Sequence, residues 1–301
     1  MTNDSKEGRT IYDFLVYLLE KKGIYILSFA IFIVIAGSLF VHFSAQPGTR
    51  ISILGLIKYT KAANQISNKE NYKLDKGMIA YYPLDGDANS KIGSHHGEVR
   101  GDLIFKNGKY GKSGYFNGSD SFVNVGNQLN LGSNDFTLNA WIKADNYNQC
   151  AKIINKGQTS VGSPKNAGYS LRIVSPSVTD KKEEYELWFD VIDNNQEREH
   201  PNCPISKLKR GQFIMITGVL KKSEGKTYLE LFVDSELIAS RHFQNIGSID
   251  TNIPLAIGAL HRGDKGKTSE KFKGYIDDVR IYNRALSGKE INKLYNTIDE
   301  K

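Results

Sequence analysis

The sequence predicts an all-β fold, a sandwich of two antiparallel sheets that is preceded by one apolar helix. Three observations carry this prediction. From residue 77 onward, short runs of strand composition are separated by turn residues, with no regular alternation of strands and helices. One such run, residues 136–143, places Phe, Leu, Ala and Ile at every second position, which is the period of a strand with two different faces. Residues 24–41 carry no charge and are rich in Ile, Phe, Leu and Val.

Residues 1–22 combine a polar start with a short amphipathic segment. Its apolar residues recur at helical spacing: Ile11, Phe14, Leu15, Leu18 and Leu19. This helix could lie on a membrane surface, contact a partner helix in an oligomer, or extend the next helix inward. Residues 23–43 follow as an apolar run of about 20 residues, the length that spans a bilayer as a helix. We therefore predict that this run anchors the chain in the lipid bilayer.

The charges that flank the apolar run predict its orientation. Lys21 and Lys22 lie directly before it, so the positive-inside bias places the N-terminus in the cytosol and everything after residue 44 outside it. A cleaved signal peptide is the alternative, because Ser44-Ala45-Gln46 could form a cleavage site. The length of the run and its late start favour an uncleaved anchor. The expected product is a single-pass membrane protein with an extracytoplasmic C-terminal domain.

The region after the anchor divides into a stalk and a β domain. Residues 44–76 are mostly polar and begin with the helix-breaking Pro47-Gly48, so we predict a stalk. The β domain extends over residues 77–297, and residues 298–301 form a tail. The predicted strands are 78–82, 98–105, 113–116, 122–125, 136–143, 151–155, 169–174, 185–191, 213–220, 228–233, 237–241, 255–257 and 274–282.

The last predicted strand contains two adjacent acids. Simple alternation would place Asp277 on one face with Val279 and Ile281, and Asp278 on the other with Ile276 and Arg280. Carboxylates inside a strand are costly to bury unless a nearby group neutralises them. A short helix follows, with Ser287 as N-cap and Glu290 three residues later, the spacing of a capping box.

The overall charge and the cysteines narrow the possible partners. The formal net charge is +7, but the basic residues are scattered and form no long run, so we predict no nucleic-acid partner. Cys150 and Cys203 are the two cysteines. They could form a disulfide if the domain lies outside the cytosol, although the sequence leaves their separation open.

Six segments follow one another in order along the domain. They are Ile79-Ala80-Tyr81-Tyr82-Pro83-Leu84-Asp85-Gly86, the loop 87–97, Gly114-Tyr115-Phe116-Asn117-Gly118, the strand 136–143, Leu231-Phe232-Val233-Asp234-Ser235-Glu236, and 272–286 with its helix. Together they resemble the laminin-G-like jelly rolls of the concanavalin-A-like superfamily. Ser235 departs from the glycine that is usual in the family's hairpin. The resemblance implies a jelly-roll sandwich with a short C-terminal helix.

The same resemblance implies one calcium ion between the opening loop and the closing strand. The candidate ligands are oxygen donors, which calcium prefers: Asp85, Asp87, Asn89, Ser90 and Asp277. These residues are also common turn formers that bind their own backbone. Lys91 and Ile92 stand where small polar residues are usual in the family, and a lysine there would repel a cation.

No catalytic motif is evident, so we predict that the protein is not an enzyme. The Glu-x-Asp-x-x-Glu motif of jelly-roll glucanases is missing, and Glu186 and Asp190 are interpreted as exposed charges on an outer strand face. Four aromatic residues could stack on sugar rings: Tyr147, Tyr169, Tyr185 and Trp188. We therefore predict an anchored extracytoplasmic module that binds a glycan or protein ligand. The alternative is a structural or assembly subunit of a membrane complex.

Overall fold

The computed structural model describes residues 74–147, 149–157, 167–176, 184–209, 211–263 and 267–297. These residues belong to one compact unit that begins at Leu74. The predicted cytosolic segment, the membrane anchor, the stalk up to residue 73 and the tail 298–301 lie outside the described residues. Within the part that is described, no helix has both the length and the apolar character needed to cross a membrane.

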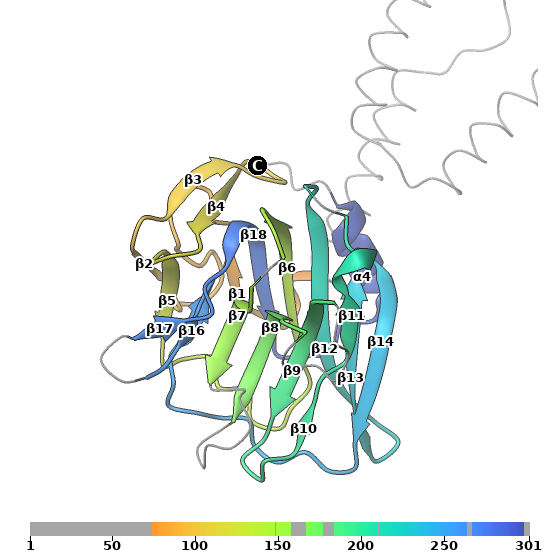
Figure 1. The fold of residues 1–301 in the computed structure, drawn as a ribbon. Coiled ribbons are helices and arrows are strands. Elements are labelled where there is room, and N and C mark those ends of the chain that lie inside the picture. The colour runs from red at the N-terminus through yellow and green to blue at the C-terminus, as the bar shows by residue number, and fades with distance from the viewer. Residues whose placement is uncertain are drawn as a thin grey trace, which may run out of the picture. The chain divides into compact units, whose positions relative to one another are not determined.

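Two antiparallel sheets face each other and confirm the predicted sandwich (Figure 1). The first sheet has the order β14-β13-β12-β6-β18-β4-β3, and β1 also pairs with β18. Its strands are β1 (Met78–Tyr82), β3 (Ile104–Asn107), β4 (Lys112–Asn117), β6 (Phe136–Ala144), β12 (Ile214–Ser223), β13 (Lys226–Val233), β14 (Glu236–Phe243) and β18 (Lys273–Tyr282). Because β18 pairs with β1, β4 and β6, the last strand of the chain lies inside this sheet.

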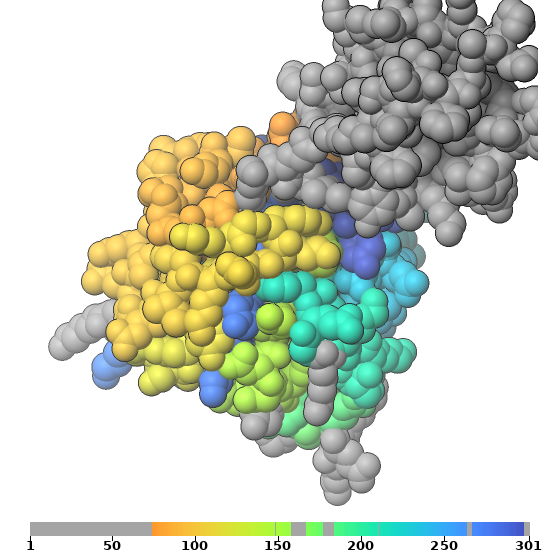
Figure 2. Space-filling model, turned by 90° about the horizontal axis from the view of Figure 1, so that it is seen from above, coloured from red at the N-terminus to blue at the C-terminus, as the bar shows by residue number. Residues whose placement is uncertain are grey.

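The second sheet has the order β10-β9-β8-β7-β15-β5-β2, with β11 also paired to β9. Its strands are β2 (Glu98–Arg100), β5 (Phe122–Gly126), β7 (Ala151–Gly157), β8 (Gly168–Val174), β9 (Glu186–Ile192), β10 (Arg198–Glu199), β11 (Asn202–Pro204) and β15 (Leu255–Ile257). A 3₁₀ turn, Ile205–Lys207, follows β11, and β16 (Leu260–His261) pairs with β17 (Thr268–Ser269). In Figure 2 the early residues of the unit, orange and yellow, lie beside green and cyan residues from the middle of the chain, so distant segments share this surface.

The core lies between the sheets and is built from alternate strand residues. Phe136 contacts the rings of both Tyr169 and Phe189, with ring centroids 5.4 and 5.9 Å apart, so the first sheet packs on the second through aromatic side chains. A separate apolar cluster covers the outer face of the first sheet, where helix α4 (Gly288–Asn296) packs and Tyr295 stacks on Trp141. The capping box of Ser287 and Glu290 is confirmed at the start of α4.

A β-bulge in β18 corrects the predicted alternation of its side chains. The pairing with β6 shifts between Asp277 and Arg280, and Asp278 has a left-handed backbone with φ of 49°. As a result Ile276, Val279 and Ile281 all belong to the core between the sheets. Asp277 therefore shares no face with Val279, which the period of two had predicted.

The predicted strands match the structure closely, with two differences. The run 98–105 is two strands, β2 and β3, which pair with different sheets. The short strands β10, β11, β16 and β17 were not predicted, because two or three residues are too few to establish a period.

Candidate functional site

The loop after β1 holds four of the five predicted calcium ligands. Asp85 Oδ1 accepts a hydrogen bond from the Lys112 amide at 2.6 Å. Asp87 Oδ1 accepts one from the Asn89 amide at 2.8 Å, which is an Asx turn. The side chains of Asp85, Asp87 and Asn89 are all exposed on this loop. Asp87 therefore performs the turn-forming role that its residue type also allows, while Asp85 joins the loop to the start of β4.

Ser90, the fourth residue of this loop, is buried and closes the loop onto β1. Its hydroxyl accepts a hydrogen bond from the Tyr81 amide at 3.0 Å and donates one to the Ile92 carbonyl at 2.6 Å. These contacts fix the path of the chain, and they use the oxygen that was predicted to bind the metal.

Asp277, the fifth predicted ligand, is fully buried, and its charge is met by backbone amides. Its Oδ2 accepts hydrogen bonds from Lys109 at 2.8 Å and Tyr110 at 3.2 Å, in the turn between β3 and β4. Asp85 binds the amide of Lys112, where this turn ends. Among the described residues, no group of three or more His, Cys, Asp or Glu is placed to hold a metal ion. Because N–H donors contact both carboxylates, these contacts do not favour calcium, which stays a prediction.

Asp278 is compensated in a different way from its neighbour. The Tyr81 hydroxyl donates to its Oδ1 at 2.6 Å, and Arg280 Nη2 lies 3.6 Å from its Oδ2. The Arg280 guanidinium also lies over the Tyr81 ring, 4.5 Å from the ring centre. The two adjacent acids of β18 thus bind different kinds of partner, backbone for one and side chains for the other.

Two of the predicted sugar-stacking residues belong to the core. Tyr169 is fully buried, and its hydroxyl donates to the Leu129 carbonyl at 2.8 Å. Its burial raises the pKa of the phenol well above the ordinary value. Tyr147 is also buried in the same core. Neither ring is available to a ligand, because Tyr169 on β8 points into the sandwich and Tyr147, in the loop after β6, packs against the same core.

Tyr185 and Trp188 lie in less enclosed places. Tyr185 is half-buried at the edge of the core. Trp188 is on the opposite face of β9, where His200 stacks on it with ring centroids 3.8 Å apart. Its Nε1 donates to Glu186 at 2.8 Å. The indole is buried under the imidazole, so a ligand could reach it only after His200 moved.

Cys150 and Cys203 are both free in the structure, which contradicts the disulfide considered above. The strand register explains why. Cys203 on β11 pairs with Leu187, which pairs with Ile173, which pairs with Ala151 next to Cys150. Three strand spacings are roughly 14 Å. A disulfide needs Cα atoms within about 7 Å.

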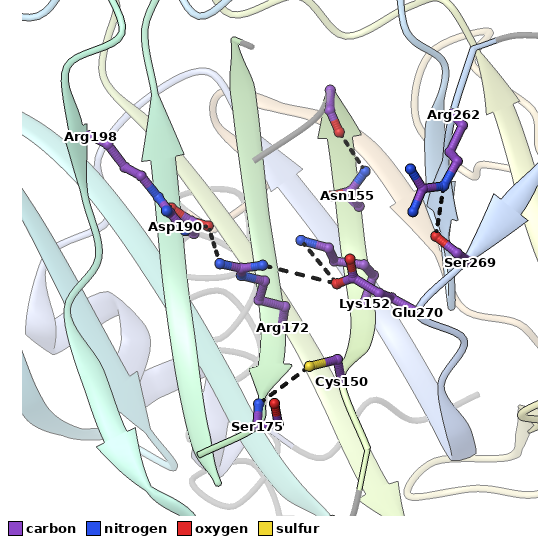
Figure 3. A network of polar contacts seen from close by, with 11 residues as sticks. Cys150, Lys152, Asn155, Arg172, Ser175, Asp190, Arg198, Arg262, Ser269 and Glu270 are labelled. Atoms are coloured by element: carbon purple, nitrogen blue, oxygen red, sulfur yellow. Dashed lines mark hydrogen bonds and ion pairs between the residues drawn. The ribbon is translucent and has the colours of Figure 1, made fainter. Parts of the chain in front are cut away.

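A charged network covers the face of the second sheet that is turned away from the core (Figure 3). We call this surface the polar face; its members are Lys152, Asn155, Ser170, Arg172, Glu186, Trp188 and Asp190, and all are buried. Asp190 is central. Arg198 holds it with two hydrogen bonds of 2.9 and 2.8 Å, and Arg172 Nη2 lies 2.9 Å from its Oδ2. The interpretation of Glu186 and Asp190 as exposed charges was therefore wrong.

Burial and the neighbouring charges shift the pKa values on the polar face. Burial is the main reason why the pKa of Lys152 is lowered to about 7, and Arg172 lowers it further. Burial alone would raise the pKa of Asp190, but Arg172 and Arg198 outweigh it and the pKa is lowered. Burial also lowers the pKa of His200. Asp190 is thus held charged, while Lys152 changes charge near neutral pH.

An open groove of about 870 Å³ lies at the end of the sandwich where β1 begins and β18 ends. Most of its lining consists of amide and charged side chains: Ile79, Asn130, Leu131, Gly132, Asn134, Asp135, Lys222, Asp250, Asn283 and Arg284. Asp135 Oδ1 accepts from the Lys222 amide at 2.9 Å, and Asp250 Oδ1 accepts from the Gly132 amide at 2.7 Å. These hydrogen bonds hold both carboxylates in place.

Sequence reasoning missed both the groove and the polar face. The groove is assembled from segments separated by up to about two hundred residues, and no local pattern joins them. The polar face had a signal, the polar residues at alternate positions of β8 and β9. This signal is weak, because alternation of polar and apolar residues predicts that a strand has a polar face but does not indicate whether that face is exposed or buried.

The family comparison agrees with this fold. The family model Laminin_G_3, described as the concanavalin A-like lectin/glucanases superfamily, matches residues 117–292, more than half of the chain. The chain therefore belongs to this superfamily. No curated protein sequence matches it significantly.

Solved structures similar to the chain include a toxin domain and a domain of an enzyme. The binding domain of Paraclostridial Mosquitocidal Protein 1 has a TM-score of 0.56 and 17% identity over 74% of this chain and 52% of that one. Domain 4 of AbnA, an extracellular GH43 arabinanase from Geobacillus stearothermophilus, was solved with arabinotriose. It has a TM-score of 0.52 and 20% identity over 72% of this chain and 98% of that one.

A third similar structure is the binding domain of Botulinum Neurotoxin DC in complex with SialylT. It has a TM-score of 0.55 and 16% identity over 75% of this chain and 53% of that one. The chain spans about half the length of the two toxin domains. At these identities the likeness concerns the fold.

Proposed function

We propose that this protein is a membrane-anchored module that presents its sandwich outside the cytosol and binds a glycan. The observation that carries the proposal is the polar groove at the end of the sandwich. Its volume of about 870 Å³ lies within the range of small-ligand sites, roughly 300–1,000 Å³. The similar structures solved with arabinotriose and with SialylT support a sugar ligand, although they have low identity to this chain.

The groove has the hydrogen-bonding groups that sugar hydroxyls need. Asn130, Asn134 and Asn283 each offer an amide donor and an amide acceptor, while Asp135 and Asp250 offer acceptors. Both carboxylates are already fixed by backbone amides, so less conformational freedom is lost when a ligand binds. The proposal assigns no catalytic step to these residues.

A glycan array probed with the full chain tests this proposal. We expect Asn134→Ala and Asn283→Ala each to weaken binding of any array ligand about tenfold, because each removes a hydrogen-bonding amide. Asn245→Ala is the matched control, because Asn245 is exposed but is not among the groove residues. Silence on the array, or equal effects of all three substitutions, would contradict a glycan site in the groove.

Membrane anchoring and calcium are separate parts of the proposal. An anchor over residues 23–43 with the sandwich outside predicts that external protease digests the C-terminal domain in intact cells. If calcium assists binding, as the family resemblance implies, chelation should weaken it and Asp85→Asn should reproduce the effect.

An assembly subunit is the alternative function, and cross-linking in native membranes that yields a defined oligomer through residues 1–43 would favour it.

A further inference from the structure

The outer face of the first sheet is only partly covered. Helix α4 packs around Trp141 on this face, where the indole is 1% exposed. Tyr115 on β4 and Tyr275 on β18 are only half-buried, and Ile104 on the edge strand β3 is 47% exposed. The side of this face that is nearer to β3 therefore presents aromatic and aliphatic groups to the surroundings.

Strand pairing places these side chains next to one another. Tyr275 is paired with Tyr115 on one side and with Lys143 of β6 on the other, and Ile104 is paired with Tyr115. Side chains at paired positions share one face of a sheet, and the two tyrosine rings have centroids 4.9 Å apart. Because Lys143 lies two residues after Trp141 on β6, all of them are on the outer face.

Three lysines hold their ammonium groups over aromatic rings of this face. Lys106 Nζ lies 4.0 Å from the centre of the Tyr115 ring, and Lys143 Nζ lies 4.0 Å from that of Tyr275. Lys109, in the turn between β3 and β4, places its Nζ 4.5 Å from the centre of the β6 indole. Each ring attracts the cation above it, so the three charges are held at the surface. We call this surface the lysine–aromatic patch; its members are Ile104, Lys106, Lys109, Tyr115, Lys143 and Tyr275.

The positive charge of the lysine–aromatic patch is not balanced by carboxylates. None of the ammonium groups of Lys106, Lys109 and Lys143 forms an ion pair with a carboxylate of the described residues. Asp145, an exposed acid beside the patch, accepts a hydrogen bond from the Tyr115 hydroxyl at 2.8 Å. Three ammonium groups beside one carboxylate leave a positive excess, which fits an anionic partner. Lys106 and Lys109 are exposed, so a partner can reach them without any rearrangement of the fold.

The composition and the position of the patch both suit a lipid surface. Lysine ammonium groups suit anionic headgroups, while tyrosine rings and an exposed aliphatic side chain suit the apolar region beneath them. Leu74, the first described residue, packs in the same apolar cluster as Trp141. The described chain therefore begins on the face that carries the patch, and the predicted anchor, residues 23–43, precedes it in the sequence.

We propose that the lysine–aromatic patch docks on a bilayer surface that contains anionic phospholipid. The ammonium groups of Lys106, Lys109 and Lys143 contact lipid phosphates, and Ile104 enters the headgroup region. This inference rests on the membrane part of the proposed function and is independent of its glycan part. The patch lies near the beginning of β18, whereas the groove lies beyond the end of that strand, at Asn283, so a docked patch leaves the groove accessible.

Lysine acylation of the full chain in lipid nanodiscs tests the proposal. Mass spectrometry measures the acylation rate of each lysine, in nanodiscs of phosphatidylcholine alone and in nanodiscs that also contain phosphatidylglycerol. The anionic lipid is expected to slow the acylation of Lys106, Lys109 and Lys143 at least about fivefold, the gain that one lysine gives at an anionic surface. Lys207 and Lys226, which are exposed outside the patch, should react equally in both. High salt should remove the difference, because it screens the attraction.

Charge variants distinguish the patch from the net charge of the chain. Lys106→Gln combined with Lys143→Gln should abolish the protection of the remaining Lys109 by anionic lipid. Lys207→Gln combined with Lys226→Gln changes the net charge by the same amount and should leave the protection of Lys109 intact. Equal loss in both double variants would mean that net charge alone is responsible, and the proposal would be wrong.

Three other results would also overturn the proposal. Equal acylation rates in the two lipid mixtures would show that the patch does not dock on anionic lipid. Protection by added dextran sulfate but not by phosphatidylglycerol would identify an acidic polymer as the partner. Protection that depends on protein concentration and not on lipid would identify a second copy of the chain.

Failure of the anchor would give a different result from failure of the patch. If residues 23–43 do not insert into nanodiscs, the anchoring part of the proposed function is wrong. Sedimentation of the full chain with vesicles of the same two lipid compositions then decides whether the patch binds anionic lipid. Binding of a glycan in the groove does not enter either comparison.

Discussion

Two buried acids, Asp277 and Asp190, lie on the outer faces of the two sheets and are neutralised by different means. Both are 0% exposed. Asp277 accepts hydrogen bonds from two backbone amides of one turn. Asp190 binds two guanidinium groups. The first acid fixes a piece of backbone, while the second holds together two charged side chains, the buried Arg172 and the half-buried Arg198.

This difference determines what each acid can contribute to function. An amide is neutral, so removing the charge of Asp277 leaves no other buried charge among its partners in the turn. Arg172 and Arg198 remain charged at every accessible pH, so they require the negative charge of Asp190 beside them. The Asp277 side chain therefore fixes the backbone of one turn, whereas Asp190 balances the charge of other side chains on the polar face.

The largest expected effect is that of Asp190→Asn. The substitution keeps the shape but removes the carboxylate that the buried Arg172 and the half-buried Arg198 share, so we expect a loss of about 3–5 kcal/mol in the free energy of unfolding. Denaturant unfolding of the full chain measures this loss. A loss below about 1 kcal/mol would mean that water, and not Asp190, solvates the two guanidinium groups.

The same substitution at Asp277 should cost less. The amide oxygen of the introduced asparagine could still accept from the backbone amides of Lys109 and Tyr110, so Asp277→Asn is expected to lose about 1–2 kcal/mol, the part due to charge. If Asp277 holds calcium instead, the unmodified chain should be stabilised by added calcium and the variant should not. Equal losses at Asp190 and Asp277 would remove the distinction between the two regions.

The pH dependence of stability tests how much the burial of Lys152 on the polar face costs, a cost that the Asp277 turn, whose partners are backbone amides, does not have. Its pKa is lowered from 10.5 to about 7, mainly by burial. Between these values the unfolded chain binds a proton that the folded chain does not, so stability rises with pH by about 1 kcal/mol per unit from about pH 7 upward. Lys152→Met should flatten this rise in denaturant titrations at about pH 7 and about pH 9. The smaller contribution of Lys156, with a pKa of about 8, has the same sign and would remain.

The sequence predicted the features that depend on residues close together in the chain, and it did not predict those that depend on strand pairing. Strand periodicity and the Ser287–Glu290 spacing predicted most of the sandwich and the cap of α4, because each depends on residues a few positions apart. The bulge at Asp278 escaped prediction, since it depends on β18 pairing with different neighbours along its length. The partners of Asp190 come together only through the register of β8, β9 and β10.

The smallest expected effect is the loss of one tyrosine hydrogen bond, compared between a buried and an exposed carboxylate. The Tyr81 hydroxyl donates to the buried Asp278 at 2.6 Å, so Tyr81→Phe should cost about 1–2 kcal/mol of unfolding free energy. Tyr115→Phe is the matched control, because its hydroxyl donates at 2.8 Å to Asp145, which is exposed. There water replaces the lost partner, and the expected change is within about 0.5 kcal/mol. Similar losses in both variants would contradict this expectation. They would mean that the tyrosine hydrogen bond contributes as much at the exposed Asp145 as at the buried Asp278.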